Sequence, residues 1–144
     1  MSLAAMVEFY PAWLPGMEGR PMASILFVDD DPYTLETLTK AAELFGHRAV
    51  LAGSGDEAIR LLTSERPDLI FIDLMLPDMD GLQLLKQIAP RTGADRMPVY
   101  VLSAAADDNL SEQALALGAQ DYLTKPLRLA TFLDIIQQYL ERAG

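Results

Sequence analysis

From Ser24 onward, the hydrophobic and polar positions of the chain form two kinds of segment in alternation. Short apolar runs of strand length recur, with the sequences SILFVD, HRAVLA, DLIFID, PVYVLS and DYLT. Longer segments lie between and after them, and in these the apolar residues return every three or four positions, as on one face of a helix. Strands that alternate with helices of this length predict an α/β domain, in which helices cover both faces of a parallel sheet.

Residues at the segment boundaries support the predicted helices. Asp31 followed by Pro32 is typical of an N-cap and a first helical position, and Gly46 is typical of a helix end. Ser54 and Glu57 have the spacing of a capping box, in which each side chain bonds the backbone of the other. We therefore expect a β-α unit to occur five times between residue 24 and the C-terminus.

Residues 1–23 differ from the rest of the chain. They combine the aromatic residues Phe9, Tyr10 and Trp13 with several prolines and glycines, which make one long helix unfavourable. We interpret this segment as an N-terminal extension or added arm, separate from a domain at residues 24–144. Its apolar side chains lead us to expect that it packs against protein, either its own domain or a neighbouring chain.

Composition excludes several classes of function. The formal net charge of −10 argues against a surface that binds nucleic acid or anionic lipid directly. The chain has no cysteine, so it has neither disulfides nor a thiolate metal site. No apolar run approaches membrane-spanning length, and the N-terminus lacks the pattern of a signal peptide. We therefore expect a cytoplasmic protein.

Polar and charged residues follow most of the predicted strands. The first strand ends at Asp29 and Asp30, the third at Asp73 and the fourth at Ser103, and the fifth leads into Lys125. Ligands of open parallel sheets bind beyond the carboxyl ends of the strands, so these side chains should gather at one edge.

This set of residues is suited to phosphoryl chemistry. Neighbouring carboxylates repel one another unless a cation joins them, and an all-oxygen site with few carboxylates suits Mg²⁺. A metal and an ammonium group can neutralise phosphoryl oxygens, a hydroxyl can donate a hydrogen bond to them, and a carboxylate can attack phosphorus.

Four segments carry a resemblance to a known family. ILFVDDDP, DLIFIDLMLPDMDGLQLL, PVYVLSA and ALALGAQDYLTKPL resemble the signature segments of receiver domains of two-component response regulators, in the family's order and spacing. The resemblance extends from about Ser24 to the C-terminus. It implies a flavodoxin-like, doubly wound sheet of five parallel strands in the order 2-1-3-4-5, which places the first and third strands side by side.

The resemblance also implies a metal site and a phosphoryl acceptor. Asp73 corresponds to the residue that accepts the phosphoryl group. Asp30, Asp73 and the backbone carbonyl of Met75 correspond to the ligands of Mg²⁺, and Asp29 would act through a bound water. Asp78 and Asp80 lie in the same loop, where aspartate is ordinary turn chemistry, and we assign them no catalytic role.

Three further residues have family counterparts. Ser103 corresponds to the hydroxyl residue that contacts the phosphoryl oxygens, and Lys125 to the lysine that pairs with them. The family aims this lysine through a cis bond, so we expect the Lys125–Pro126 bond to be cis. Tyr122 corresponds to an aromatic switch that turns inward when the serine hydroxyl moves, although a half-buried aromatic with no switching role is the alternative.

The implied function is phosphorelay signalling. Asp73 would receive the phosphoryl group from a histidine kinase or a phosphotransfer protein, and an output partner of unknown identity would recognise the phosphorylated domain. The chain would then catalyse only its own phosphorylation and its own slow dephosphorylation, and it would not be an enzyme acting on other substrates. A homodimer is possible, because family members often pair.

Two alternatives remain. One is a Mg²⁺-dependent hydrolase that works through an aspartyl-phosphate. Such hydrolases carry a second acid, the general acid, two residues after the nucleophile, and in this chain that position is Met75. The other is an interaction domain that no longer accepts phosphate.

Overall fold

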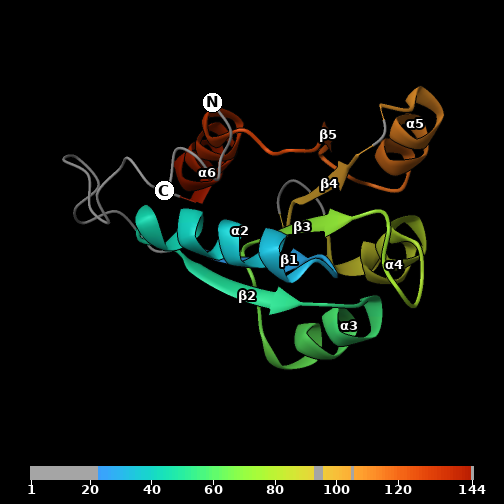
Figure 1. Ribbon diagram of the computed structural model, residues 1–144, viewed down its shortest axis with the longest axis horizontal. Helices are drawn as coiled ribbons and strands as arrows, with labels where there is room; N and C mark the ends of the chain where they lie inside the picture. Colours follow the sequence, from blue (N-terminus) through green and yellow to red (C-terminus); the bar gives the residue numbers. More distant parts are fainter. Residues whose placement is uncertain (1–22, 93–95, 105, 144) are drawn as a thin grey trace.

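A computed structural model describes residues 23–92, 96–104 and 106–143 of the chain (Figure 1). The expectations for the N-terminal arm concern residues 1–23, and all of these except Ala23 lie outside the described residues. None of the helices in the described ranges is long and apolar enough to cross a membrane.

The described residues form one five-stranded parallel sheet with helices on both faces (Figure 1). The strands run in the order β2-β1-β3-β4-β5, which confirms the expected doubly wound, flavodoxin-like fold. The strands are β1 (Ser24–Val28), β2 (Arg48–Ala52), β3 (Leu69–Asp73), β4 (Val99–Ser103) and β5 (Asp121–Thr124). The helices are α2 (Pro32–Leu44), α3 (Gly55–Ser64), α4 (Gly81–Ile88), the short 3₁₀ helix η1 (Ala89–Arg91), α5 (Asp108–Ala116) and α6 (Leu129–Ala143).

Two apolar layers hold the helices to the sheet. On the face covered by α2 and α6, Phe27, Phe71 and Phe132 pack against one another with ring centroids 5.6–6.2 Å apart. On the other face, Ile70 and Ile72 of β3 pack with apolar residues of α3, α4 and α5. Every residue of β3 is buried, as expected for a central parallel strand whose two faces are both covered.

The sheet register brings the polar strand ends together. In the β1–β3 pair, Val28 lies opposite Ile72, so that Asp29 follows beside Asp73 at the carboxyl end of the sheet. In the β3–β4 pair, Asp73 lies opposite Leu102, which places Ser103 one residue further along the adjacent strand.

The helix boundaries largely follow the sequence. Asp31 caps α2 by accepting a hydrogen bond from the N–H of Tyr33, and Gly46 ends this helix with a positive φ of 81°. The expected capping box of α3 forms only by half. Ser54 accepts from the N–H of Glu57, but the Glu57 carboxylate accepts from Gly53, one residue before the N-cap.

At the opposite end of the sheet from the acidic residues, Asp68 joins three elements. One of its carboxylate oxygens accepts from the N–H of Ser24 at 2.7 Å, and the other accepts from the hydroxyl of Tyr139 at 2.7 Å. Burial of the phenol, together with the hydrogen bond and charge of Asp68, raises the pKa of Tyr139 to about 12. The contact therefore links β1, the start of β3 and α6.

This contact predicts a pH-dependent stability. Folded Tyr139 keeps its proton up to about pH 12, whereas an unfolded tyrosine loses it near pH 10, so the stabilisation is complete below about pH 10 and is lost as the pH rises through about 12. Urea denaturation from about pH 8 to about pH 11 should show Tyr139→Phe less stable than the native chain, with a difference that shrinks at the alkaline end. Tyr33→Phe, at an exposed tyrosine, should match the native chain at about pH 8. A difference for Tyr139→Phe that stays constant with pH would contradict this assignment.

Candidate functional site

Three carboxylates gather at the carboxyl ends of β1 and β3. Asp29, Asp30 and Asp73 each offer an oxygen, and these oxygens all lie within 4.8 Å of one another. Asp29 and Asp73 are only 2% and 6% exposed, whereas Asp30 is exposed. The structure therefore brings together the three acidic residues that the sequence predicts.

Lys125 supplies the positive charge of this cluster. Its Nζ lies 2.7 Å from Oδ2 of Asp29 and 3.2 Å from Oδ2 of Asp73, so that one ammonium group joins both buried carboxylates. The Lys125–Pro126 peptide bond is cis, as expected. The backbone N–H of Lys125 donates to the carbonyl of Ser103 at 2.7 Å, which fixes the start of this loop to the end of β4.

The second oxygen of each buried carboxylate accepts a backbone hydrogen bond. Oδ1 of Asp29 accepts from the N–H of Asp31 at 3.0 Å, and Oδ1 of Asp73 accepts from the N–H of Met75 at 3.2 Å. Both carboxylates are therefore held in orientation by the chain just beyond their own strand, as well as by Lys125.

Burial governs the electrostatics of the site. Burial raises the pKa of Asp73, and the charge of Asp29 adds to this rise, while the N–H of Met75 and the ammonium group of Lys125 oppose it. Burial alone would lower the pKa of Lys125, but its hydrogen bonds and charge interactions with Asp29 and Asp73 outweigh burial and raise it. The acidic groups therefore stabilise the charged lysine at the cost of placing like charges side by side.

The chemistry of the donor set fits a hard divalent cation. The three carboxylates offer oxygen atoms only, the exposed Asp30 leaves the cluster open to solvent, and Lys125 provides a single positive charge for the group. Mg²⁺ prefers such a site of few carboxylates, where it retains several of its waters.

The loop between β3 and α4 borders the cluster. Met75 is 76% exposed and forms an isolated bridge with Asp80, while the N–H of Gly81 donates to the carbonyl of Leu74 at 2.8 Å. A Cβ on Gly81 would lie 2.7 Å from the carbonyl oxygen of Asp73, so this tight closure requires glycine. The loop thus holds Met75 beside Asp73, and the role of the Met75 carbonyl as a metal ligand stays a prediction.

Ser103 and Tyr122 occupy different surroundings. Ser103 ends β4 beside the tip of β3 and is only 3% exposed. Tyr122 lies opposite Val101 in the β4–β5 pair, is half-buried and packs against the apolar layer below α3, α4 and α5. Ser103 is therefore next to the acidic cluster, whereas the switching role of Tyr122 stays a prediction.

Two loop aspartates have roles that the sequence reasoning missed. Asp80 is the N-cap of α4 and forms a full capping box with Gln83, which the spacing of these two residues could have revealed. Asp78 accepts hydrogen bonds from the backbone of Gly55 and Asp56 in α3. No local sequence pattern predicts the contact of Asp78 with α3, because it joins residues that are far apart in the sequence.

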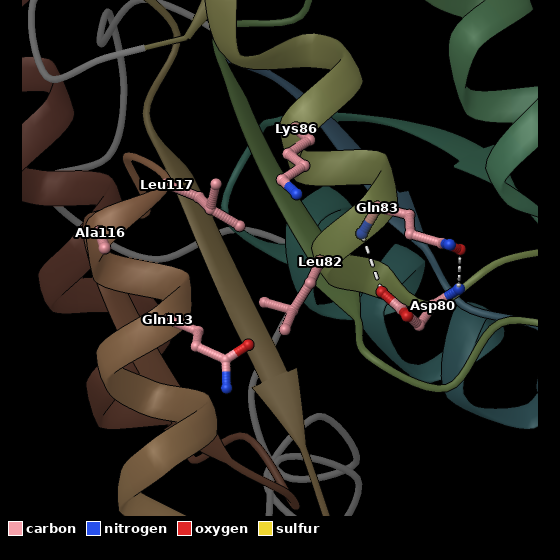
Figure 2. Close-up of a pocket in the computed structure, with 7 residues that line it drawn as sticks. All are labelled: Asp80, Leu82, Gln83, Lys86, Gln113, Ala116 and Leu117. Atoms are coloured by element: carbon pink, nitrogen blue, oxygen red, sulfur yellow. Dashed lines mark hydrogen bonds between the residues drawn. The ribbon is translucent and has the colours of Figure 1, made fainter.

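A separate cavity lies between α4 and α5 (Figure 2). It has a volume of about 410 Å³, and Figure 2 shows the Asp80–Gln83 pair at its α4 side and Gln113 on the facing helix α5. The residues that line this cavity do not include Asp29, Asp30 or Asp73. The acidic cluster is therefore a separate site at the edge of the sheet.

Comparison with known proteins gives consistent matches. A sequence profile of the response regulator receiver domain matches residues 25–137. The response regulator MprA of Mycolicibacterium vanbaalenii is 39% identical over 120 residues, which cover 82% of this chain and 50% of that protein. The chain therefore spans about half the length of the curated relatives it matches.

Solved structures of similar proteins share the fold. The crystal structure of a two-component response regulator from Clostridium difficile matches with a TM-score of 0.79 and 32% identity, covering 85% of this chain and 99% of that one. The BeF3-activated N-terminal receiver domain of Klebsiella pneumoniae RstA matches with a TM-score of 0.73 and 29% identity, covering 81% and 97%.

Because Lys125 pairs with both Asp29 and Asp73, replacing it should have a large effect on stability. Lys125→Met removes the counter-charge of two buried carboxylates, so we expect the free energy of unfolding to fall by roughly 3 kcal/mol in metal-free buffer. Lys40→Met is the matched control, because Lys40 pairs with Glu36 on the exposed face of α2 and such pairs contribute little. Urea denaturation would measure both variants. Equal losses for the two would show that the Lys125 contacts do not stabilise the fold.

Proposed function

The chain belongs to the response regulator receiver domain family, and on this premise we propose that it accepts a phosphoryl group onto Asp73 from a histidine kinase or a phosphotransfer protein. Receiver domains of response regulators are signalling domains of two-component systems. The observation that carries the proposal is the placement of Asp73, a buried carboxylate at a strand tip that contacts Lys125 and lies beside Asp29 and Asp30.

In the proposed reaction, a carboxylate oxygen of Asp73 attacks the phosphorus of a phosphohistidine. A P–O bond forms, the P–N bond breaks and its electron pair leaves with the imidazole, so the product is an aspartyl-phosphate. The raised pKa of Asp73 supports this role, because a more basic carboxylate oxygen is a better nucleophile. The backbone hydrogen bond from Met75 orients the same carboxylate before the reaction.

Lys125 and Ser103 act on the transferred group in this proposal. The ammonium group of Lys125, which contacts Asp73 at 3.2 Å, is close enough to pair with an oxygen of a phosphoryl group attached there. Ser103, at the end of the neighbouring strand, donates a hydrogen bond from its hydroxyl to another phosphoryl oxygen. Transfer of this kind depends on positioning and charge neutralisation, and both residues serve these ends.

Magnesium is the proposed cofactor. Asp30, Asp73 and the backbone carbonyl of Met75 would hold the ion directly, and Asp29 would hold it through water. When bound, the ion neutralises negative charge on the phosphoryl oxygens.

The proposed output is a change of surface near Ser103 and Tyr122. Movement of the Ser103 hydroxyl toward the phosphoryl group opens space into which half-buried Tyr122 turns, and an output partner or a second copy of the chain recognises the altered surface. Since the chain spans about half of its curated relatives, the identity of that output is a proposal for the whole protein. Met75, which carries no acid, gives the alternative hydrolase reading no support.

The acceptor assignment predicts the loss of labelling in one variant. After incubation with acetyl phosphate and Mg²⁺, the native chain should gain the mass of one acid-labile phosphoryl group, and Asp73→Asn should not, because an amide is a poor nucleophile. Asp31→Asn, which changes the exposed cap of α2, should label like the native chain. Intact mass spectrometry reports all three. Labelling of Asp73→Asn at the native rate would show that another residue is the acceptor.

The metal assignment predicts a weaker affinity when Asp30 is changed. Asp30→Asn should raise the Kd for Mg²⁺ by roughly tenfold, because one of few carboxylate ligands is lost. Asp31→Asn should leave the Kd unchanged. Calorimetric titration of Mg²⁺ into each protein measures the effect, and chelation of the metal should abolish labelling by acetyl phosphate. An unchanged Kd in Asp30→Asn would remove Asp30 from the ligand set.

A further inference from the structure

The β3–α4 loop, residues 74–80, is closed at its two ends by local contacts. The N–H of Gly81 donates to the carbonyl of Leu74, Met75 forms a bridge with Asp80, and Asp80 caps α4. These contacts hold the loop ends together, but they do not fix the middle of the loop against the rest of the domain.

The middle of the loop is attached to α3 by Asp78. Oδ1 accepts from the N–H of Gly55 and Oδ2 accepts from the N–H of Asp56, both at 2.8 Å. The next residue, Met79, lies against the same helix end, since a Cβ on Gly55 would fall 2.5 Å from its sulfur. Two consecutive loop side chains therefore contact the first turn of α3.

The contact completes the hydrogen bonding of the first turn of α3. The first N–H groups of a helix lack partners within the helix, and here Ser54 satisfies only that of Glu57 by its side chain. Asp78 accepts from the N–H groups of Gly55 and Asp56 with a charged group, at the helix end that favours negative charge. The hydrogen bonds from Asp56 and Gly55 lower the pKa of Asp78, so it remains an ionised acceptor at neutral pH.

We propose that Asp78 is a positioning residue for the acidic site, which it serves by holding the β3–α4 loop against α3. Met75 lies three residues before Asp78 with Pro77 between them, and the fixed φ of proline limits how far Met75 can move independently. The N–H of Met75 in turn holds Oδ1 of Asp73. The path therefore runs from α3 through Asp78 and the loop to the Asp73 carboxylate, and the role rests on the proposed function of that carboxylate.

A purely structural role would give a different result, and α3 offers a matched control. Asp78→Ala and Ser54→Ala each remove side-chain acceptors from the first turn of α3, but only the first detaches the loop. Within the described residues, the side chain of Asp78 bonds to the α3 backbone and not to the acidic cluster, so any effect on the cluster passes through the loop.

The test compares the two variants by amide NMR and Mg²⁺ titration of the full chain. In metal-free buffer, Asp78→Ala should shift the Met75 amide resonance and speed its hydrogen exchange, while Ser54→Ala leaves both at native values. The Kd for Mg²⁺ should rise roughly tenfold in Asp78→Ala and stay near the native value in Ser54→Ala. Asp78→Asn keeps one acceptor oxygen and should fall between the native chain and Asp78→Ala, and it provides a folded variant if the alanine variant does not fold.

Each outcome decides the inference. A native Met75 amide and a native Kd in both Asp78 variants would overturn it, and so would equal changes in Asp78→Ala and Ser54→Ala, which would mean that only α3 was weakened. Failure of the native chain to bind Mg²⁺ or to accept a phosphoryl group would refute the proposed function separately, because the metal-free Met75 amide still reports whether Asp78 holds the loop.

Discussion

The constraint on which the rest of the structure depends is the repulsion between two carboxylates placed at the tips of adjacent buried strands. Asp29 and Asp73 are almost completely buried, and both burial and the neighbouring charge of Asp29 disfavour the ionised form of Asp73. Lys125 makes the arrangement possible because its ammonium group contacts both. One positive charge does not balance the three acids of the cluster, so the site retains a net negative charge that favours a divalent cation.

The parallel sheet brings these charges together from distant parts of the sequence. β1 and β3 become neighbours only because the chain adds β2 at one edge and then crosses back to the other side of β1. The aromatic layer below α2 and α6 fixes β1 against β3, with Phe27 opposite Phe71. A slip in this register would separate Asp29 from Asp73, so the core sets the spacing of the charged groups as well as the stability of the domain.

The sequence predicts the fold and most of the site for a simple physical reason. Apolar periodicity identifies the elements, and parallel strands must end at a common edge, so Asp29, Asp73 and Lys125 could be grouped before any coordinates were known. The same reasoning fails where a contact depends on packing between elements. Asp78 looks like an ordinary turn residue, yet it bonds a helix that begins 23 residues earlier. The Glu57 carboxylate likewise accepts a hydrogen bond from the N–H of Gly53, a contact that the capping-box spacing does not predict.

The buried and exposed parts of the site indicate which segments would move first after the proposed phosphorylation of Asp73. Residues 69–73 are buried in a packed sheet and cannot move without disturbing the core. Among the described residues, the β3–α4 loop, with exposed Met75, and the segment that begins with Lys125 lie next to Asp73 but outside the packed sheet. In the proposed reaction, a phosphoryl group on Asp73 attracts the ammonium group of Lys125 away from its position between Asp29 and Asp73. The same group adds negative charge beside the β3–α4 loop. The response should therefore begin in the loops beyond the strand tips and reach the helices through contacts such as that of Asp78.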